Sequence, residues 1–444
     1  MARVSAEVLP RGVRRVVIGL VVNPVAGVGG PAGLAGSDGA DVQRLALARG
    51  ARSRVQERAV FALTTLAERH PGLVVATVAG AMGADAVRAA GLVPRVVGVG
   101  ARDAGSAGSP EAAGVTEAAD TSRAVAALAA AGADLILVVG GDGTLRDAVS
   151  GLGAVGHPSG ERVDGGRGDD GPALEAENSR QAHGQGGSGT RTPRLGLPAV
   201  LGVPAGVKMY SPVFAVSPRA AGSIAADWID HDGLPTEERE VLDIDEASMR
   251  RARVDPTLYG MLRVPHRSGR TQARKAPTPV TEAAAVEAAA RGAVSRMRPG
   301  VRYLLGPGGT IAEITRQLGV EGSPLGVDVV LDGAILVRGA SEQELLAQIA
   351  EGPAQAVVTV IGGQGFLLGR GNQQLSASVL RALGDDPLLV VAPEQKLIDL
   401  HGRPLLVDTG DPELDARLAG HVRIITGVGT SSLYAVSAPE LISV

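Results

Sequence analysis

The sequence predicts a two-domain α/β protein, with a doubly wound parallel sheet in the N-terminal domain and a β-rich α/β C-terminal domain. Three features lead to this prediction. The chain has 444 residues, which is long for a single hydrophobic core. In its first half, short apolar runs alternate with helical patterns. In its second half, apolar runs typical of strands outnumber helical patterns.

In the first half, apolar runs and helical patterns follow the order expected of a parallel sheet. Strands are predicted at residues 15–22, 73–78, 96–99, 133–139 and 199–203, and helices at 55–68, 84–90, 121–131 and 218–229. The helix at 55–68 is indicated by Val60, Leu63 and Leu66, which recur at helical spacing. Asp120 is the predicted N-cap of the helix before the central strand. The first domain is predicted to span residues 16–236, after a tail at 1–15.

The most informative stretch is the central strand and the turn after it. Five apolar residues, Leu135 to Val139, are typical of a buried parallel strand. The next residues are Gly140, Gly141, Asp142, Gly143 and Thr144. The glycines allow positive φ, and Thr144 is the predicted N-cap of the following helix. Backbone N–H groups and a helix N-terminus would then surround a phosphate, with the Asp142 carboxylate in reach for a metal ion or a reacting hydroxyl.

Residues 156–194 form an insertion between two predicted elements of this sheet. They are rich in Gly, Asp, Arg, Gln and Ser and contain almost no large apolar side chain. Such a segment cannot bury enough surface to order itself, so we predict a disordered surface insertion. Its charges nearly balance, which argues against an arm that binds nucleic acid.

The second domain is predicted to span residues 237–444. Strands are predicted at 241–244, 257–264, 301–305, 357–361, 388–391, 405–407 and 422–426, and an alanine-rich helix at 283–298. At 306–310 the sequence Gly-Pro-Gly-Gly-Thr repeats the order of strand, glycine turn, threonine and helix. Asn372 and Gln373 lie in a later pair of glycine turns, where their amides could bind sugar hydroxyls or a base edge, or could cap the turns themselves.

Three aspartates of the second domain are less informative. Asp328 lies inside an apolar run, where a buried carboxylate is costly unless it is paired. A structural pair and a ligand contact are equally compatible with this position. Asp408 and Asp411 are predicted to be turn residues rather than ligands.

Composition excludes several classes of partner. The 43 basic and 47 acidic residues nearly balance, so neither a nucleic acid nor an anionic membrane is expected. There is no cysteine, which removes disulfide and thiolate chemistry and favours the cytosol. No apolar run approaches the roughly 20 residues of a membrane-spanning helix. The first 15 residues contain no apolar core of a signal peptide. We therefore expect a cytoplasmic protein.

Lysine is rare in this chain. Of the 43 basic residues only three are lysines: Lys208, Lys275 and Lys396. A chain that otherwise uses arginine can retain lysine where a compact ammonium is needed. The alternative is that these lysines have no special role, and we favour it for Lys396.

Taken together, the glycine turns resemble those of a known family. Gly-Gly-Asp-Gly-Thr at 140–144 is the signature of the superfamily that contains NAD kinases and diacylglycerol or sphingosine kinases. Segments 23–30, 202–208, 361–366 and 371–374 resemble the ATP-NAD kinase-like branch that includes acetoin catabolism protein X. The resemblance spans residues 16–427, nearly the whole chain.

The resemblance implies a kinase that phosphorylates NAD or a related nucleotide, with ATP as donor and Mg²⁺ as metal ion. It implies that Asp142 is the general base toward the adenosine 2′-hydroxyl or a metal contact, and that Lys208 contacts phosphate. The nucleotide-binding residues expected from it are Asn23, Gly27, Gly140, Gly141, Gly143, Thr144, Arg146, Lys208, Gly308, Thr310, Asn372 and Gln373. A homo-oligomer is also expected.

Two other functions stay open at this point. NAD kinases carry an Asn-Glu or Asn-Asp pair, whereas the nearest element here is Asn372-Gln373. An amide carries no charge, so the acceptor of such a kinase could differ from NAD.

A non-catalytic nucleotide-binding accessory protein of acetoin catabolism would retain the same glycine turns. A lipid kinase shares Gly-Gly-Asp-Gly-Thr, but the chain shows no exposed apolar docking segment and its later motifs fit the other branch better.

Overall fold

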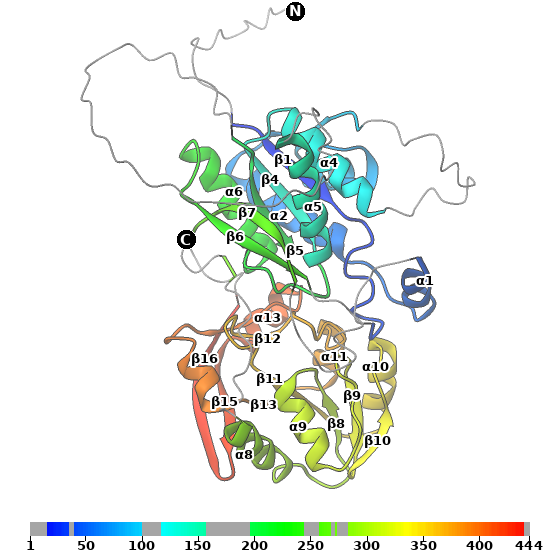
Figure 1. Cartoon of the computed structure of the whole chain (residues 1–444). Helices are drawn as coiled ribbons and strands as arrows, with labels where there is room; N and C mark the ends of the chain where they lie inside the picture. Colours follow the sequence, from blue (N-terminus) through cyan, green and yellow to red (C-terminus); the bar gives the residue numbers. More distant parts are fainter. Residues whose placement is uncertain are drawn as a thin grey trace, which may run out of the picture.

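The computed structural model describes residues 16–34, 40–99, 117–156, 196–243, 257–267, 271–272 and 283–438. Figure 1 shows two lobes, one formed by the N-terminal elements in blue to green and one by the C-terminal elements in yellow-green to red. The predicted tail at 1–15 lies outside the described residues, and so does the predicted insertion at 156–194 apart from Gly156.

Five parallel strands form the centre of the N-terminal lobe. Their order across the sheet is β3 (Val93–Val96), β2 (Val74–Thr77), β1 (Ile18–Val22), β4 (Leu135–Gly140) and β5 (Ala199–Pro204). Every residue of β1, β4 and β5 is buried, as continuous apolar runs predict. The order of the strands reverses between β1 and β4. Open parallel sheets bind ligands at the carboxyl ends of strands beside such a reversal.

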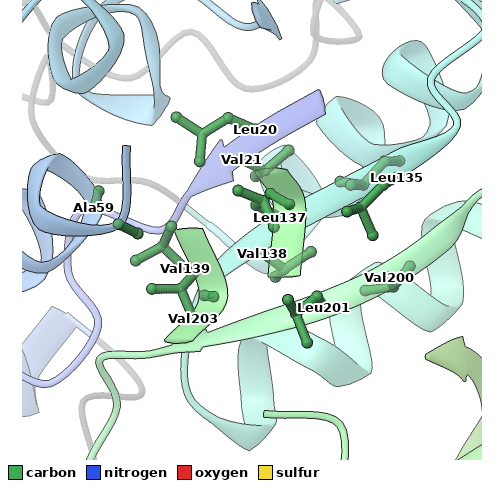
Figure 2. Packing of buried hydrophobic residues seen from close by; sticks show 14 of the residues in the cluster. Leu20, Val21, Ala59, Leu135, Leu137, Val138, Val139, Val200, Leu201 and Val203 are labelled. Carbon is green, nitrogen blue, oxygen red and sulfur yellow. The ribbon is translucent and has the colours of Figure 1, made fainter. Parts of the chain in front are cut away.

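Helices cover this sheet in two packed pairs. The elements are α1 (Ala40–Ala48), α2 (Val55–Arg69), the 3₁₀ turn η1 (Gly80–Met82), α3 (Ala84–Ala89), α4 (Ala118–Ala130), α5 (Asp142–Gly156) and α6 (Pro218–Asp230). α2 packs against α6 and α4 against α5, and both pairs contact the strands. Figure 2 shows side chains of β1, β4, β5 and α2 packed together in the hydrophobic core between the sheet and its helices. This arrangement confirms the predicted doubly wound sheet.

A two-stranded antiparallel hairpin follows α6. It consists of β6 (Thr236–Asp243) and β7 (Thr257–Pro265) and packs on β5 and α5. Val241, Leu262 and Val264 of the hairpin belong to the core of the N-terminal lobe. The predicted boundary at residue 237 therefore falls at the start of a hairpin that packs with the first lobe, and the boundary itself stays a prediction.

The C-terminal lobe contains a nine-stranded mixed sheet. Its order is β10 (Ala334–Val337), β9 (Asp328–Leu331), β8 (Arg302–Leu305), β11 (Ala354–Thr359), β13 (Leu388–Val391), β15 (Gly420–Gly427), β16 (Thr430–Ser437), β14 (Leu405–Val407) and β12 (Phe366–Leu368). β8, β11, β13 and β15 are parallel, so their carboxyl ends lie along one edge. This strand-rich lobe confirms the predicted C-terminal architecture.

Helices pack on both sides of several of these strands. They are α8 (Ala283–Val294), α9 (Gly309–Gln317), α10 (Glu342–Ala350), α11 (Ala377–Ala382), α12 (Glu394–Ile398) and α13 (Pro412–Leu418). Residues of α8 and α9 share one apolar core with Tyr303 of β8 and Val357 of β11. Residues of α10, α11 and α13 share a second core with Leu304 and Val358 of the same strands. Alternate residues of β8 and β11 therefore point into two different cores, as expected for strands covered on both faces.

A buried carboxylate joins the two lobes. Asp408, just after β14, pairs with Arg58 of α2 and with Arg370 after β12. The side chains of Asp408 and Arg370 are each 3% exposed. The Arg370 guanidinium also donates to the Val216 carbonyl at 3.0 Å and to Gln272 Oε1 at 3.1 Å. Burial by itself would raise the pKa of Asp408, but the two arginines hold it below its usual range. Asp408 is thus an ionic contact between the lobes, a role beyond that of a turn residue.

Several element ends differ from the sequence predictions. α4 begins at Ala118, because Glu117 is its N-cap and Asp120 completes a capping box from the third position. α5 begins at Asp142, so Thr144 lies within its first turn and is not its N-cap. β3 lies at Val93–Val96, three residues before the predicted 96–99. The apolar pattern predicted each element, but local hydrogen bonds decided where it begins.

Replacing Asp408 by Asn should destabilise the fold strongly. The variant leaves the buried Arg370 guanidinium without its carboxylate, and breaking a buried ion pair typically costs about 3–5 kcal/mol. Differential scanning calorimetry should show a clearly lower midpoint temperature. Asp85→Asn is the control, because Asp85 and Arg88 form a surface pair with both side chains 59% exposed. Such pairs contribute about 0–1 kcal/mol. Equal midpoints for the two variants would contradict the structural role of Asp408.

Candidate functional site

Three glycine turns meet at the carboxyl edge of the N-terminal sheet. Gly27 follows β1, Gly141 follows β4 and Gly206 follows β5. Two backbone hydrogen bonds fix the last two turns together. The Ala205 N–H donates to the Gly140 carbonyl at 3.0 Å, and the Asp142 N–H donates to the Lys208 carbonyl at 3.1 Å.

Side chains at these glycines would prevent the turns from meeting. A Cβ on Gly206 would lie 2.2 Å from Gly141 Cα, and a Cβ on Gly141 would lie 3.0 Å from Gly206 Cα. Gly27 has a φ of 73°, and a Cβ there would lie 2.3 Å from the Ala205 carbonyl oxygen. Backbone therefore packs directly on backbone, which explains the need for glycine in all three turns.

Asn23 and Thr144 connect the first turn to the second. Asn23 Nδ2 donates to Thr144 Oγ1 at 3.2 Å, and Asn23 Oδ1 accepts from the Val25 N–H at 3.3 Å. A Cβ on Gly140 would lie only 2.2 Å from Thr144 Oγ1. The Thr144 side chain can therefore occupy its position only because residue 140 is a glycine. The structure thus brings together Asn23, Gly27, Gly140, Gly141, Gly143 and Thr144.

The Asp142 carboxylate is buried beneath segment 209–211, which follows the glycine turn after β5. Asp142 is 1% exposed. It accepts hydrogen bonds from the Tyr210 N–H at 2.6 Å, the Ser211 N–H at 3.0 Å and Ser211 Oγ at 2.6 Å. These three bonds fix segment 209–211 against the turn after β4. Any contact between Asp142 and a substrate therefore requires this segment to move.

Burial also changes the acidity of Asp142. It raises the pKa of this carboxyl to about 6, and the hydrogen bonds from Ser211 and Tyr210 oppose the shift. The nearby charge of Asp243 adds to the increase in pKa. A carboxyl with this pKa is largely ionised at neutral pH, and general bases work best when their pKa lies near the working pH.

The described residues provide only part of a magnesium site. Mg²⁺ prefers octahedral oxygen ligands and usually combines one or two carboxylates with substrate phosphates and water. In the described part of the chain, no three His, Cys, Asp or Glu side chains cluster as a metal site. Asp142 could supply one carboxylate, but its oxygens already accept three protein hydrogen bonds. The other ligands would have to come from nucleotide phosphates and water.

The Arg146 side chain points away from the glycine turns, whereas the Lys208 backbone lies beside them. Arg146 Nη1 donates to Asp243 at 3.2 Å, and its guanidinium lies 5.7 Å from the ring centroid of Tyr259. The Arg146 side chain is therefore directed toward the β6–β7 hairpin. Lys208 is half-buried, and its carbonyl holds the Asp142 N–H.

Asn372 and Gln373 have distinct partners although they are neighbours. Asn372 Oδ1 accepts from the Gly369 N–H at 2.9 Å, and Asn372 Nδ2 donates to the Leu367 carbonyl at 2.8 Å. Asn372 thus caps its own turn, which is one of the two roles predicted for it. Gln373 Nε2 donates to the Gly206 carbonyl at 3.1 Å, so this amide reaches across to the N-terminal lobe.

An interlobe cavity lies next to the turns after β1 and β5. It encloses about 640 Å³, including space open to solvent, and its lining includes Gly27, Gly206, Gln373, Arg52 and Arg54. Asp142 does not line it. The cavity offers glycine backbone and guanidinium groups, which are the groups that bind phosphates.

A C-terminal cavity of about 1680 Å³, again including open solvent space, lies at the carboxyl ends of β8, β11 and β13. Gly308 lines it, as do Met209 and Tyr210 of the loop that covers Asp142. Thr310 is 1% exposed, and its Oγ1 accepts from Lys396 Nζ at 3.3 Å. Gly308 therefore lines a different cavity from Gly27 and Gly206, although Met209 lines both cavities.

Several residues of the site carry no signal in the sequence. Tyr210 and Ser211 bind Asp142 across 68 and 69 residues of chain, and Arg58 binds Asp408 across 350. Their spacing matches no motif. Asp328, in contrast, can now be assigned: its carboxylate accepts from Ser323 N–H and Oγ and from the Gly339 N–H, which makes it structural.

Comparisons with protein families match both lobes. Residues 18–158 match the ATP-NAD kinase N-terminal domain, and residues 298–436 match the ATP-NAD kinase C-terminal domain. Comparisons with curated proteins and with solved structures found no match. Among the described helices, none is both long enough and apolar enough to cross a bilayer.

The free energy of unfolding should fall as the pH rises from about 4 to about 6, because the folded protein holds the Asp142 proton more tightly than the unfolded chain does. The unfolded chain binds this proton with a pKa near 3.8 and the folded chain with a pKa of about 6. The contribution is therefore fully present below pH 3.8 and is lost as the pH rises through about 6. Urea unfolding of wild type and Asp142→Asn across this range should show their free-energy difference falling with pH.

Asp415→Asn is a parallel test, because burial also raises the pKa of Asp415 to about 6, and its free-energy difference from wild type should fall with pH in the same way. This variant retains the titration of Asp142 and loses only its own. A difference between wild type and Asp142→Asn that does not vary with pH would show that the pKa of Asp142 is not raised.

Proposed function

We propose, because the chain belongs to the ATP-NAD kinase-like family, that it transfers a phosphoryl group from ATP to NAD or a related nucleotide. The matches to the N-terminal and C-terminal domains of this family support a phosphotransferase of the kinase type. The identity of the acceptor and the catalytic activity of this chain belong to the proposal.

The observation that carries the proposal is the meeting of three glycine turns at the N-terminus of α5. Phosphoryl transfer depends on positioning and charge neutralisation more than on covalent chemistry. The glycines let the backbone of the three turns pack together at the start of α5, where the positive end of the helix dipole lies, and Gly27 and Gly206 also line the interlobe cavity. This geometry supports binding of the donor phosphates by Asn23, Gly27, Gly140, Gly141, Gly143 and Thr144.

In this proposal Asp142 acts as general base or contacts Mg²⁺ after segment 209–211 has moved. Its pKa of about 6 suits a base. The same segment is bound from the other side, where Gln272 Nε2 and Gln364 Nε2 donate to the Met209 carbonyl at 2.8 and 3.0 Å. Segment 209–211 therefore links Asp142 to the C-terminal lobe, so that nucleotide binding between the lobes could release the carboxylate.

Positive charge for the phosphates would come from Lys208, Arg52 and Arg54. Arg52 and Arg54 line the interlobe cavity. Arg146 is a weaker candidate, because its guanidinium already binds Asp243. Asn372 is a weaker candidate for the acceptor ribose, because both ends of its amide bind backbone. With no charged residue in place of Asn372-Gln373, an acceptor other than NAD is compatible with the proposal.

A second candidate function is a nucleotide-binding accessory protein without turnover, serving acetoin or related carbon catabolism. The observation that favours it is the complete burial of Asp142 beneath Tyr210 and Ser211. A carboxylate held in this way can maintain a binding loop and transfer nothing. That the protein is cytoplasmic and homo-oligomeric stays a prediction under both functions.

Asp142→Asn should abolish most turnover while nucleotide binding remains. Wild type is assayed with ATP, Mg²⁺ and a panel of NAD, NADH and smaller nucleosides. Loss of a general base typically lowers the rate about 10²–10⁴-fold. ATP affinity should stay within about tenfold, since the backbone N–H groups remain. Asp147→Asn, one turn further along α5, is the control and should retain activity.

Two outcomes would count against this assignment. Normal turnover by Asp142→Asn would show that Asp142 only holds the loop. Wild type that binds ATP but phosphorylates no member of the panel would favour the accessory function.

Lys208→Ala should weaken binding of Mg²⁺-ATP with little change in stability. A charged hydrogen bond to phosphate contributes about 1.5–3 kcal/mol, so affinity should fall about 10- to 100-fold. Isothermal titration calorimetry measures the affinity and thermal unfolding the stability. Unchanged affinity would mean that the Lys208 ammonium does not contact the phosphates.

A further inference from the structure

Gln272 binds the backbone of segment 209–211, the segment that covers Asp142. Gln272 Nε2 donates to the Met209 carbonyl at 2.8 Å and lies 3.4 Å from the Ser211 carbonyl oxygen. Two backbone N–H groups of the same segment donate to the Asp142 carboxylate. The segment is therefore held through its carbonyl groups by an amide and through its N–H groups by a carboxylate.

The position of Gln272 is itself fixed by both lobes. The residue is 3% exposed, and its backbone N–H donates to the Phe214 carbonyl at 2.8 Å, in the segment that follows β5. Its side-chain Oε1 accepts from Arg370 Nε at 3.1 Å. Gln272 is thus attached by its backbone to the N-terminal lobe and by its side chain to an arginine of the C-terminal lobe.

Only one orientation of the Gln272 amide satisfies both of its side-chain partners. A guanidinium can only donate hydrogen bonds, and a backbone carbonyl can only accept them. The amide oxygen must therefore face Arg370, and the NH₂ group must face the Met209 carbonyl. Rotation of the amide by half a turn would place oxygen against oxygen at Met209. Arg370 therefore holds Gln272 in the orientation that binds the segment.

Arg370 also belongs to the ionic contact between the lobes. Its Nη1 pairs with Asp408 at 2.7 Å, and both side chains are 3% exposed. A continuous series of hydrogen bonds therefore begins at this interlobe ion pair, passes through Gln272 and segment 209–211, and ends at Asp142. Each member of the series is in direct contact with the next.

A second glutamine binds the same carbonyl by a separate route. Gln364 is 5% exposed, and its Nε2 donates to the Met209 carbonyl at 3.0 Å. Both lone pairs of this oxygen are then occupied. Gln364 lines the C-terminal cavity, whereas Gln272 lines neither that cavity nor the interlobe cavity. A substitution at Gln272 therefore acts on the segment without removing a group that faces either cavity.

We propose that Gln272 is a positioning residue that keeps segment 209–211 closed over Asp142, and that Arg370 makes this closure depend on the contact between the lobes. Movement of one lobe away from the other withdraws Arg370, frees the Gln272 amide and lets the segment leave the carboxylate. The effect on turnover rests on the proposed kinase function. The closure does not, because it is a property of the protein without substrate.

Hydrogen–deuterium exchange of the full-length protein without nucleotide tests the closure. Gln272→Met replaces the amide by an uncharged side chain of similar length. With one hydrogen bond lost, the N–H groups of Tyr210 and Ser211 should exchange about 2- to 10-fold faster. Arg370→Lys should act in the same direction, because a lysine ammonium can pair with Asp408 but has no second N–H group at the position of Nε.

Gln272→Glu tests the orientation of the amide. The carboxylate still accepts from Arg370 Nε, but it cannot donate to the Met209 carbonyl. Exchange at residues 209–211 should therefore be at least as fast as in Gln272→Met. Melting temperatures measured in parallel show that each variant is folded at the temperature of the exchange experiment.

Pairs of substitutions distinguish a connected series from independent contacts. Gln272→Met and Arg370→Lys remove the same restraint, so the double variant should exchange no faster than the faster of the two single variants. Gln364→Met removes a separate donor, so its effect should at least multiply that of Gln272→Met. Gln355→Met is the matched control, because the Gln355 amide lies at the surface, and exchange at residues 209–211 should equal that of wild type.

Turnover gives a second readout. Because closure limits access to Asp142, Gln272→Met should raise kcat by about the factor by which exchange is accelerated. KM for ATP should stay within about twofold, since Gln272 lines neither cavity.

Three results would overturn the proposal. They are unchanged exchange at residues 209–211 in Gln272→Met, multiplied effects in the double variant of Gln272 and Arg370, and a lower kcat in Gln272→Met. Failure of the kinase proposal gives a different result, namely no turnover by wild type or any variant while the differences in exchange remain.

Discussion

Contact of backbone with backbone at Gly27, Gly141 and Gly206 is the constraint on which the rest of the site depends. A single Cβ at Gly206 would overlap Gly141, and one at Gly27 would overlap the Ala205 carbonyl. Because these turns follow three neighbouring strands, their contact fixes the carboxyl edge of the N-terminal sheet. It also brings residues 208–211 over the start of α5, where they bind both the N–H and the carboxylate of Asp142.

The burial of Asp142 that results has two consequences. The carboxylate loses solvent, which raises its pKa toward the range useful for proton transfer. The same burial separates it from the two cavities, because segment 209–211 covers the carboxylate. Met209 and Tyr210 of this segment also line the C-terminal cavity, and Met209 lines the interlobe cavity. A short loop therefore lies between the Asp142 carboxylate and both cavities.

The two lobes use the same principle of site construction. In each, neighbouring parallel strands end in glycine turns, and a helix begins at one of them: α5 after β4 and α9 after β8. The buried pairs of Asp408 with Arg58 and Arg370, together with Gln373 on Gly206, hold the two edges near each other. Buried ion pairs require good geometry to be stable, so they favour one arrangement of the lobes.

The sequence alone determined the fold class, the central strand and the glycine turns, because apolar periodicity and glycine content are local properties. The five strands of the first sheet and the helices α2, α3, α4, α6 and α8 lie within a few residues of their predicted positions. The sequence analysis predicted no helix at α1, α10, α11, α12 or α13. Helix starts were less predictable: Thr144 lies inside α5, since the hydrogen bonds that cap a helix depend on the final geometry. Partners such as Ser211 for Asp142, Arg58 for Asp408 and Thr310 for Lys396 became known only from the tertiary structure. Chain segments distant in sequence make these contacts, so their burial and pKa shifts exist only once the two lobes have folded.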